Sequence, residues 1–311
     1  MANKSTHDHH VAHRDTSDLP AITDLIQDSW KLFEKTAIIY VKLFVLIAAF
    51  LLVGILIGFI IALPLSLNAF SPNFNAFLHP AGFSILLLIV LLVWLILYLL
   101  IIIGVGIMFP IVSLFILQEK KKEPLISLIK QSKPYILPYF ITLLLSSLIT
   151  LGGVFLFVIP GLIIGVFFVF VIYEVVLDGQ TGRAAIKRSY ILVRNHFWEI
   201  IVRLFILEIG ILIISSILND LAGGNWLLEL VKFLFSVFSI WYSRAYVYLL
   251  YQQVRARTTF PEHISIRWIW IVSGIGWFLV LALMMALSTG AVRVPGMMHA
   301  PHHYMVPRGT V

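Results

Sequence analysis

Long runs of apolar residues follow one another along this chain. A helix needs about 20 such residues to cross a hydrocarbon core roughly 30 Å thick. The runs are uniformly apolar and do not alternate as the strands of a membrane barrel do. The pattern therefore predicts an all-α protein, a polytopic bundle of transmembrane helices. The expected spans cover residues 37–63, 83–109, 136–158, 161–177, 197–218, 226–252 and 268–288.

The second apolar run is longer than a single span requires, because it continues from Phe83 to Leu117. One straight helix over this stretch would be about 52 Å long at 1.5 Å per residue. Pro110 lacks a backbone N–H, and its ring clashes with the preceding helical turn. We therefore expect a bend near Pro110, with residues 111–117 at or beyond the cytoplasmic interface.

Basic residues are confined to alternate loops, which predicts the topology. Four segments carry 18 of the 22 basic residues, and the loops between them, 64–82, 159–161 and 219–225, carry none. Basic loops stay in the cytoplasm. We therefore expect a multi-pass protein of the cell membrane with a cytoplasmic N-terminus and, after seven spans, an outside C-terminus. The basic segments are 1–42, 118–134, 178–203 and 253–267.

Composition agrees with this interpretation and bears on the partners. Hydrophobic residues make up 60% of the chain and charged residues 12%, against about 25% charged in soluble domains. A soluble globule is therefore excluded. The net charge of +7 predicts anionic lipid headgroups on the cytoplasmic face as partners, and no nucleic acid, because the cations flank apolar segments. The expected headgroup contacts are Lys130, Lys133, Lys187, Arg188 and Arg194.

Three cytoplasmic segments, 22–33, 125–136 and 182–193, resemble one another. Each has a central serine, Ser29, Ser132 or Ser189, with apolar residues at −3 and +4 on the same helical face. The pattern predicts three repeats of an amphipathic helix plus two spans, at about 20–117, 124–178 and 182–252. Together they form a six-span domain over 20–255, to which the span 268–288 is added. Such helices can be connectors that cap the bundle, or surfaces that bind lipid or a protein partner; the connector is the simpler interpretation.

A family resemblance rests on three neighbouring stretches. They are Ile159-Pro160-Gly161, which we expect to form the outer turn, the stretch Tyr173 to Gly179, and the stretch Ala184 to Leu192. This pattern resembles the integral membrane domain found with bacterial glycerophosphodiester phosphodiesterases and related uncharacterised six-helix bacterial membrane proteins. The resemblance implies a helical membrane domain and hardly any defined activity. The chain departs from it in the seventh span and in both tails.

Charged residues inside the spans are the best pointer to function, because an unpaired charge in the bilayer is expensive. Glu208 and Arg244 lie at matching depths on consecutive antiparallel spans, so we expect a central ion pair. Structural pairing within the bundle is the simpler interpretation of all these charges, and transport is the alternative. The other expected pairs are Glu174–Arg203, Glu199–Arg203 and Glu229–Lys232.

No catalytic motif is evident in the sequence, so we predict a non-enzymatic protein without a cofactor. The tails, residues 1–19 and 289–311, are rich in His or in Met and His. Imidazole and thioether groups suit copper or nickel, but disordered tails of biased composition are the simpler interpretation, and we predict no metal site. The leading hypothesis is a role in envelope or lipid homeostasis, or as a membrane accessory domain. The alternative is a transporter of a small solute or lipid that uses the buried charges.

Overall fold

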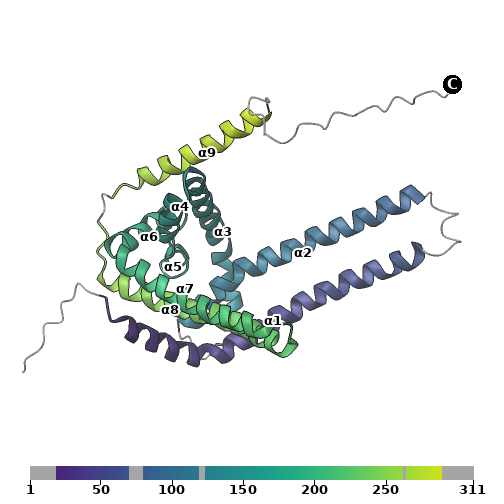
Figure 1. Cartoon of the computed structure of the whole chain (residues 1–311), viewed down its shortest axis with the longest axis horizontal. Helices are drawn as coiled ribbons and strands as arrows, with labels where there is room; N and C mark the ends of the chain where they lie inside the picture. Colours follow the sequence, from purple (N-terminus) through teal and green to yellow (C-terminus); the bar gives the residue numbers. More distant parts are fainter. Residues whose placement is uncertain (1–18, 70–79, 119–122, 262–263, 289–311) are drawn as a thin grey trace, which may run out of the picture. The chain divides into compact units, whose positions relative to one another are not determined.

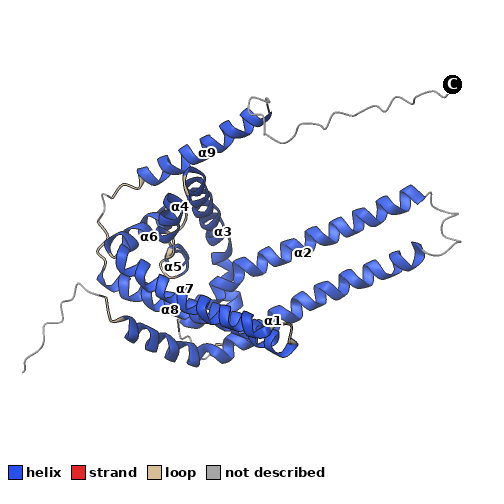
Figure 2. Cartoon of the chain, in the orientation of Figure 1, coloured by secondary structure: helices blue, strands red, loops and turns tan. Residues whose placement is uncertain are grey.

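The structure, a computed structural model, describes residues 19–69, 80–118, 123–261 and 264–288. The regular elements in these residues are all helices (Figure 2). Within the described residues, seven helical segments are long and apolar enough to cross a membrane. The prediction of an all-α, multi-pass membrane protein is confirmed. Both His-rich tails fall almost wholly outside the described residues.

The helices of the described residues are labelled in Figure 1. They are α1 (Ile22–Ala69), α2 (Pro80–Leu117), α3 (Leu125–Leu156), α4 (Val158–Phe167), α5 (Val171–Val176), α6 (Arg183–Asn195), α7 (Phe197–Ala222), α8 (Trp226–Arg257) and α9 (Arg267–Ser288). The segments 22–33 and 125–136 form the first turns of α1 and α3 without a break before the span. Only the third segment is a separate helix, α6, so the threefold repeat stays a prediction.

Helix α2 runs through Pro110 as one helical element. The Ser113 hydroxyl donates to the carbonyl of Pro110 at 2.7 Å. Residues 111–117, which we expected at or beyond the interface, are buried almost throughout, with Ile111, Val112 and Ser113 at 0% exposure. The last two turns of α2 therefore pack inside the protein.

The chain divides into two compact units, of which the first comprises Met1–Ser146 and Val166–Ile266. In this unit α7 and α8 form an antiparallel hairpin. Its turn uses Gly223 at a φ of 44° and the Asn225 side chain, which accepts a hydrogen bond from the backbone N–H of Leu227 at 3.0 Å. A positive φ suits glycine because it has no Cβ, and an asparagine cap satisfies one free N–H of the new helix.

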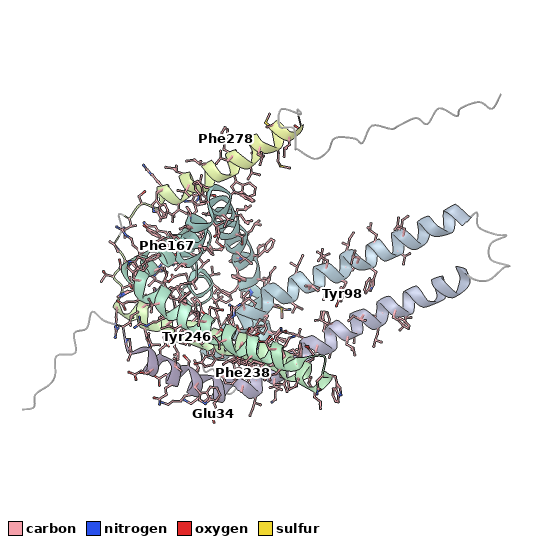
Figure 3. All side chains as sticks on the ribbon, in the orientation of Figure 1. Glu34, Tyr98, Phe167, Phe238, Tyr246 and Phe278 are labelled. Carbon is pink, nitrogen blue, oxygen red and sulfur yellow. The ribbon has the colours of Figure 1, made fainter. Side chains whose placement is uncertain are left out.

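Aromatic side chains join α1 to α8 in the same unit. The ring of Tyr40 stacks on that of Trp241 with centroids 5.4 Å apart, and Phe33 meets Phe238 edge-on at 4.8 Å. Phe238 and Tyr246 are labelled on α8 in Figure 3. Helices α1 and α2 run alongside one another (Figure 1), and Gly58 of α1 leaves room for the ring of Trp94. Close packing of large rings thus fixes α1 within this unit.

The second unit comprises Ser147–Gly165 and Arg267–Val311. Its described part holds the end of α3, most of α4, and α9. Glycines allow close contact here: a Cβ on Gly276 of α9 would collide with the carbonyl oxygen of Gly152 in α3. The indole N–H of Trp277 donates to the carbonyl of Leu148 at 3.0 Å. Helix α9 is therefore packed on the end of α3 by backbone contact.

The outer turn differs from the sequence prediction. The break between α3 and α4 lies at Phe157, and Ile159, Pro160 and Gly161 belong to the first turns of α4. Proline is well tolerated in a first helical turn, where its missing N–H has no partner to lose. A Cβ on Gly161 would come within 2.6 Å of the backbone nitrogen of Val154. Gly161 therefore serves helix packing, and the turn itself is shorter than expected.

The topology can be tested with single cysteines, because the chain has none of its own. We expect Asp220→Cys, at the exposed end of α7, to react with a membrane-impermeant maleimide on intact cells. Lys133→Cys, on the exposed part of α3, should react only after permeabilisation, because basic segments stay in the cytoplasm. The reverse labelling pattern would contradict the predicted orientation.

The glycine contact of the second unit makes a separate prediction. Gly276→Ala should lower the free energy of unfolding by about 1–3 kcal/mol, because the new Cβ overpacks the α3–α9 contact. Gly274→Ala is the matched control, since no atom lies within 4 Å of its Cβ position. Denaturation in detergent followed by tryptophan fluorescence measures both. Equal midpoints for the two variants would show that α9 does not pack on α3 in this way.

Candidate functional site

Two carboxylates lie one helical turn apart at the end of the fourth predicted span. Glu174 belongs to α5, a short helix with all six residues buried, and its side chain has 0% exposure. Asp178 follows four residues later, so both carboxylates lie on the same side. Gly179 then reverses the chain at a φ of 66°, and the N–H of Gln180 donates to the carbonyl of Glu174 at 3.0 Å. The turn holds both carboxylates in place.

Two arginines from other helices meet these carboxylates. Arg188 of α6 brings Nε within 3.2 Å of Oε2 of Glu174. Arg255 of α8 brings Nη1 within 2.8 Å of Oδ2 of Asp178 and 3.6 Å of Oε1 of Glu174. Two positive charges thus face two negative charges across α5, α6 and α8.

Aromatic residues complete this arrangement. The Tyr251 hydroxyl lies 3.2 Å from Oε1 of Glu174, to which it donates, and 3.3 Å from Oδ2 of Asp178. The Phe260 ring lies under both guanidinium groups, 4.5 Å from that of Arg188 and 5.3 Å from that of Arg255. We call Glu174, Asp178, Arg188, Tyr251, Arg255 and Phe260 the charge cluster.

The charge cluster is suited to fixing helices in place. Its formal charges balance, and each carboxylate faces a guanidinium. Breaking a buried ion pair by removing one partner costs several kcal/mol, because the other charge is left uncompensated. The geometry therefore indicates a structural tie between α5, α6 and α8.

Glu174 does not pair with Arg203, contrary to the sequence prediction. The Arg203 guanidinium lies 3.5 Å from a carboxylate oxygen of Glu199 and donates to the backbone carbonyl of Pro20 at 2.9 Å. Arg188 and Arg255 come from helices that pack directly on α5. They therefore neutralise Glu174 in place of Arg203. Arg203 instead anchors the chain just before α1. The expected pairs Glu199–Arg203 and Glu229–Lys232, the latter at 3.1 Å, are confirmed.

The residues expected at lipid headgroups fall into two groups. Arg188 pairs with the buried carboxylate of Glu174, a contact that the sequence analysis did not predict. Lys130, Lys133 and Arg194 are exposed, and Lys187 is half-buried. Headgroup binding by these four residues stays a prediction.

The apolar face of α6 is covered by protein. Ile186, Leu192 and Val193 all have 0% exposure. This agrees with the interpretation of the segment as a connector. Only the exposed face of α6, which carries Arg194, is therefore free to contact the membrane surface.

The three central serines are all fully buried. Ser29 donates to the carbonyl of Leu25 at 2.6 Å, one turn back in its own helix. Ser132 makes a similar bond within α3. Only Ser189 reaches another helix, because its hydroxyl donates to the carbonyl of Phe167 at the end of α4 at 2.7 Å. Small buried serines thus permit close helix packing at all three positions.

Glu208 and Arg244 line a common hollow, and the structure records no ion pair between them. The hollow has a volume of about 390 Å³ and lies within the first unit. Among the described residues, neither side chain has an ion pair or a side-chain hydrogen bond. The hollow is lined by Val169, Tyr173, Glu208, Ile211, Ser239, Ile240, Ser243, Arg244 and Val247. We call it the charged hollow.

The charged hollow lies inside the membrane-spanning part of α7 and α8. Glu208 is eleven residues past Phe197, the first residue of α7, or about 16 Å along the axis at 1.5 Å per residue. Glu208 and Ile240 are both exposed at its surface. Tyr173 forms part of its wall and stacks on Tyr251 of the charge cluster, with ring centroids 5.0 Å apart. The structural tie therefore supports one wall of the hollow.

No family model matches this chain, and no curated protein or solved structure matches it. The resemblance to the membrane domain of bacterial phosphodiesterases therefore stays a prediction. The argument for function rests on the charge cluster and the charged hollow.

The sequence pattern identified Glu174, Glu208, Arg244 and Arg203 as charges that need partners. It did not identify Asp178, Arg255, Tyr251 or Phe260 as members of a site. One signal was present: Glu174 and Asp178 are four apart and lie on one side of a helix. Arg255 lies at the end of the sixth span, where basic residues are normal, so nothing singled it out.

The charge cluster predicts strong coupling between Glu174 and Arg188. Glu174→Gln or Arg188→Gln alone should lower the free energy of unfolding by about 2–3 kcal/mol, because each removes the nearest ionic partner of the other residue. The double variant should lose clearly less than the sum of the two. Denaturant titration in detergent measures the cycle.

Glu229→Gln is the control for this cycle, since its half-exposed carboxylate pairs with Lys232 near the first residue of α8. It should cost about 0.5 kcal/mol, as exposed ion pairs do. Additive losses for Glu174→Gln and Arg188→Gln would contradict a direct ion pair.

Proposed function

We propose that this chain is a non-enzymatic integral membrane protein of lipid or envelope homeostasis that binds a phospholipid headgroup in the charged hollow. The observation that carries the proposal is the pair of opposite charges, Glu208 and Arg244, lining one hollow among membrane-spanning helices without an ion pair between them. Charges at such depth need a partner. A ligand that carries both signs supplies one to each.

A zwitterionic headgroup has the required chemistry. Its ammonium group pairs with the carboxylate of Glu208, and its phosphate pairs with the guanidinium of Arg244, a planar donor set that matches phosphate oxygens. The hydroxyl of Ser243 adds a hydrogen-bond donor beside Arg244.

The surroundings favour a lipid as the source of that headgroup. Ile240, at the surface of the hollow, is 51% exposed, and neighbouring Phe205 and Leu212 of α7 are 63% and 67% exposed. Apolar side chains so exposed on spanning helices offer a surface for acyl chains. A lipid can therefore enter from the bilayer without crossing water.

A second function, transport of a small solute, is favoured by the same hollow. A hollow that reaches an intramembrane carboxylate is typical of a substrate pathway. A water-soluble solute would need a route from an aqueous phase. Lipid entry needs none, so lipid binding is the better-supported proposal.

Native mass spectrometry of the purified protein tests the proposal. We expect co-purifying phosphatidylethanolamine or another zwitterionic lipid on the wild type. Glu208→Gln and Arg244→Gln should each reduce its retention by about tenfold, because one ionic contact is worth roughly 1.4 kcal/mol or more at this depth.

Glu229→Gln and Arg257→Gln are the matched controls, since they remove charges of the same kind outside the charged hollow. Both should retain the lipid as the wild type does. Unchanged retention in both Glu208→Gln and Arg244→Gln would refute the proposal. Retention of a water-soluble ion or metabolite in the hollow, with no lipid, would favour transport.

A further inference from the structure

A second hollow continues from the charged hollow along α7 and α8. Its volume is about 650 Å³, and the two hollows share Glu208 and Ile211 as lining residues. The second hollow is lined by Phe205, Glu208, Ile209, Ile211, Leu212, Ser215, Ser216, Asn219 and Lys232. We call it the outer hollow, because Asn219 and Lys232 lie close to the turn between α7 and α8, which is predicted to be outside.

The polar groups of the outer hollow recur with a helical period. Glu208, Ser215 and Asn219 follow one another along α7 at spacings of seven and four residues, and so lie on one face of the helix. Lys232 of α8 closes this face, donating to the Asn219 side chain at 3.0 Å and pairing with Glu229 at 3.1 Å. The face is polar although most of the middle of α7 is apolar.

The two hollows together cover a large part of the bilayer. Arg244 lines the charged hollow and Lys232 the outer hollow, and both belong to α8. Their positions are twelve residues apart, which corresponds to about 18 Å along the helix axis. This distance is more than half of a hydrocarbon core of roughly 30 Å. A headgroup that moves from one to the other crosses most of the core beside polar side chains.

The order of the charges suits a zwitterionic headgroup. Along this path a cation, Arg244, is followed by an anion, Glu208, and then by a second cation, Lys232. A phosphate can leave Arg244 for Lys232 while the ammonium group stays near Glu208 between them. Each position offers a partner for both charges of the headgroup.

We propose that α7 and α8 let phospholipids exchange between the two leaflets along the charged and outer hollows. The inference rests on the proposed function, because it takes the headgroup bound at Glu208 and Arg244 as its starting point. The main barrier to exchange is removal of the charged headgroup from water. The polar path lowers that barrier while the acyl chains stay in the bilayer. Exchange runs down a concentration gradient and needs no energy source.

A leaflet-exchange assay with the full-length protein tests the inference. Vesicles of phosphatidylethanolamine and phosphatidylglycerol contain a trace of phosphatidylethanolamine that carries its fluorescent label on an acyl chain, so the zwitterionic headgroup is intact, and dithionite reduces the label that it reaches from outside. Protein-free vesicles lose only the outer-leaflet signal. Vesicles with the wild type should go on to lose the inner-leaflet signal, without ATP. Signal loss no faster than in protein-free vesicles would overturn the inference.

Ser215→Leu combined with Ser216→Leu makes the outer hollow apolar and partly fills it. This variant should slow the exchange by about tenfold or more, since each 1.4 kcal/mol added to a barrier slows a rate tenfold. The matched control is Ile213→Leu combined with Ile217→Leu, on the same helix and outside both hollows. The control should exchange lipid at the wild-type rate, and equal rates in the two double variants would overturn the inference.

Two further readings separate the possible failures. A soluble fluorophore trapped inside the vesicles must stay protected, because its reduction would reveal a leak and overturn the assignment to lipid exchange. Lipid retention by native mass spectrometry tests the charged hollow alone. Retention without exchange refutes this inference and leaves the proposed function standing, whereas loss of retention in the wild type refutes both.

Discussion

The buried carboxylate of Glu174 is the constraint on which the first unit depends. A charge with no exposure in a membrane protein is tolerated only with close partners of opposite sign. Arg188 and Arg255 supply them from two different helices. Helices α5, α6 and α8 must therefore meet at one point, and the short helix α5 is positioned by its charge as much as by its apolar neighbours.

This tie also bears on the charged hollow. Tyr173 precedes Glu174 in α5 and forms part of the wall of the hollow, so the tie positions that wall. The protein thus has two kinds of intramembrane charge. In the charge cluster the charges neutralise one another and hold helices together. In the charged hollow, Glu208 and Arg244 lie around an open volume, and the structure records no ion pair between them.

The sequence predicted the architecture well and the sites less well. Seven apolar runs identify the spans because the bilayer thickness imposes a minimum length on each of them. Pairs within one helix, Glu199–Arg203 and Glu229–Lys232, also follow from spacing alone. Pairs between helices depend on how each helix is rotated, which the uniformly apolar spans do not encode. The assignment of Arg203 to Glu174 was wrong for that reason, and the pairing of Arg188 with Glu174 was missed.

The close contact between Gly152 and Gly276 has a consequence for biogenesis. The second unit is built from residues 147–165 and 267–288, and the ribosome makes residues 166–266 of the other unit between them. Contacts so distant in sequence form late. The glycine face at the end of α3 must therefore enter the membrane and wait there until the last helix has been synthesised. Until α9 is synthesised, the glycine face of α3 is open to association with another chain. Packing of α9 on that face removes this hazard.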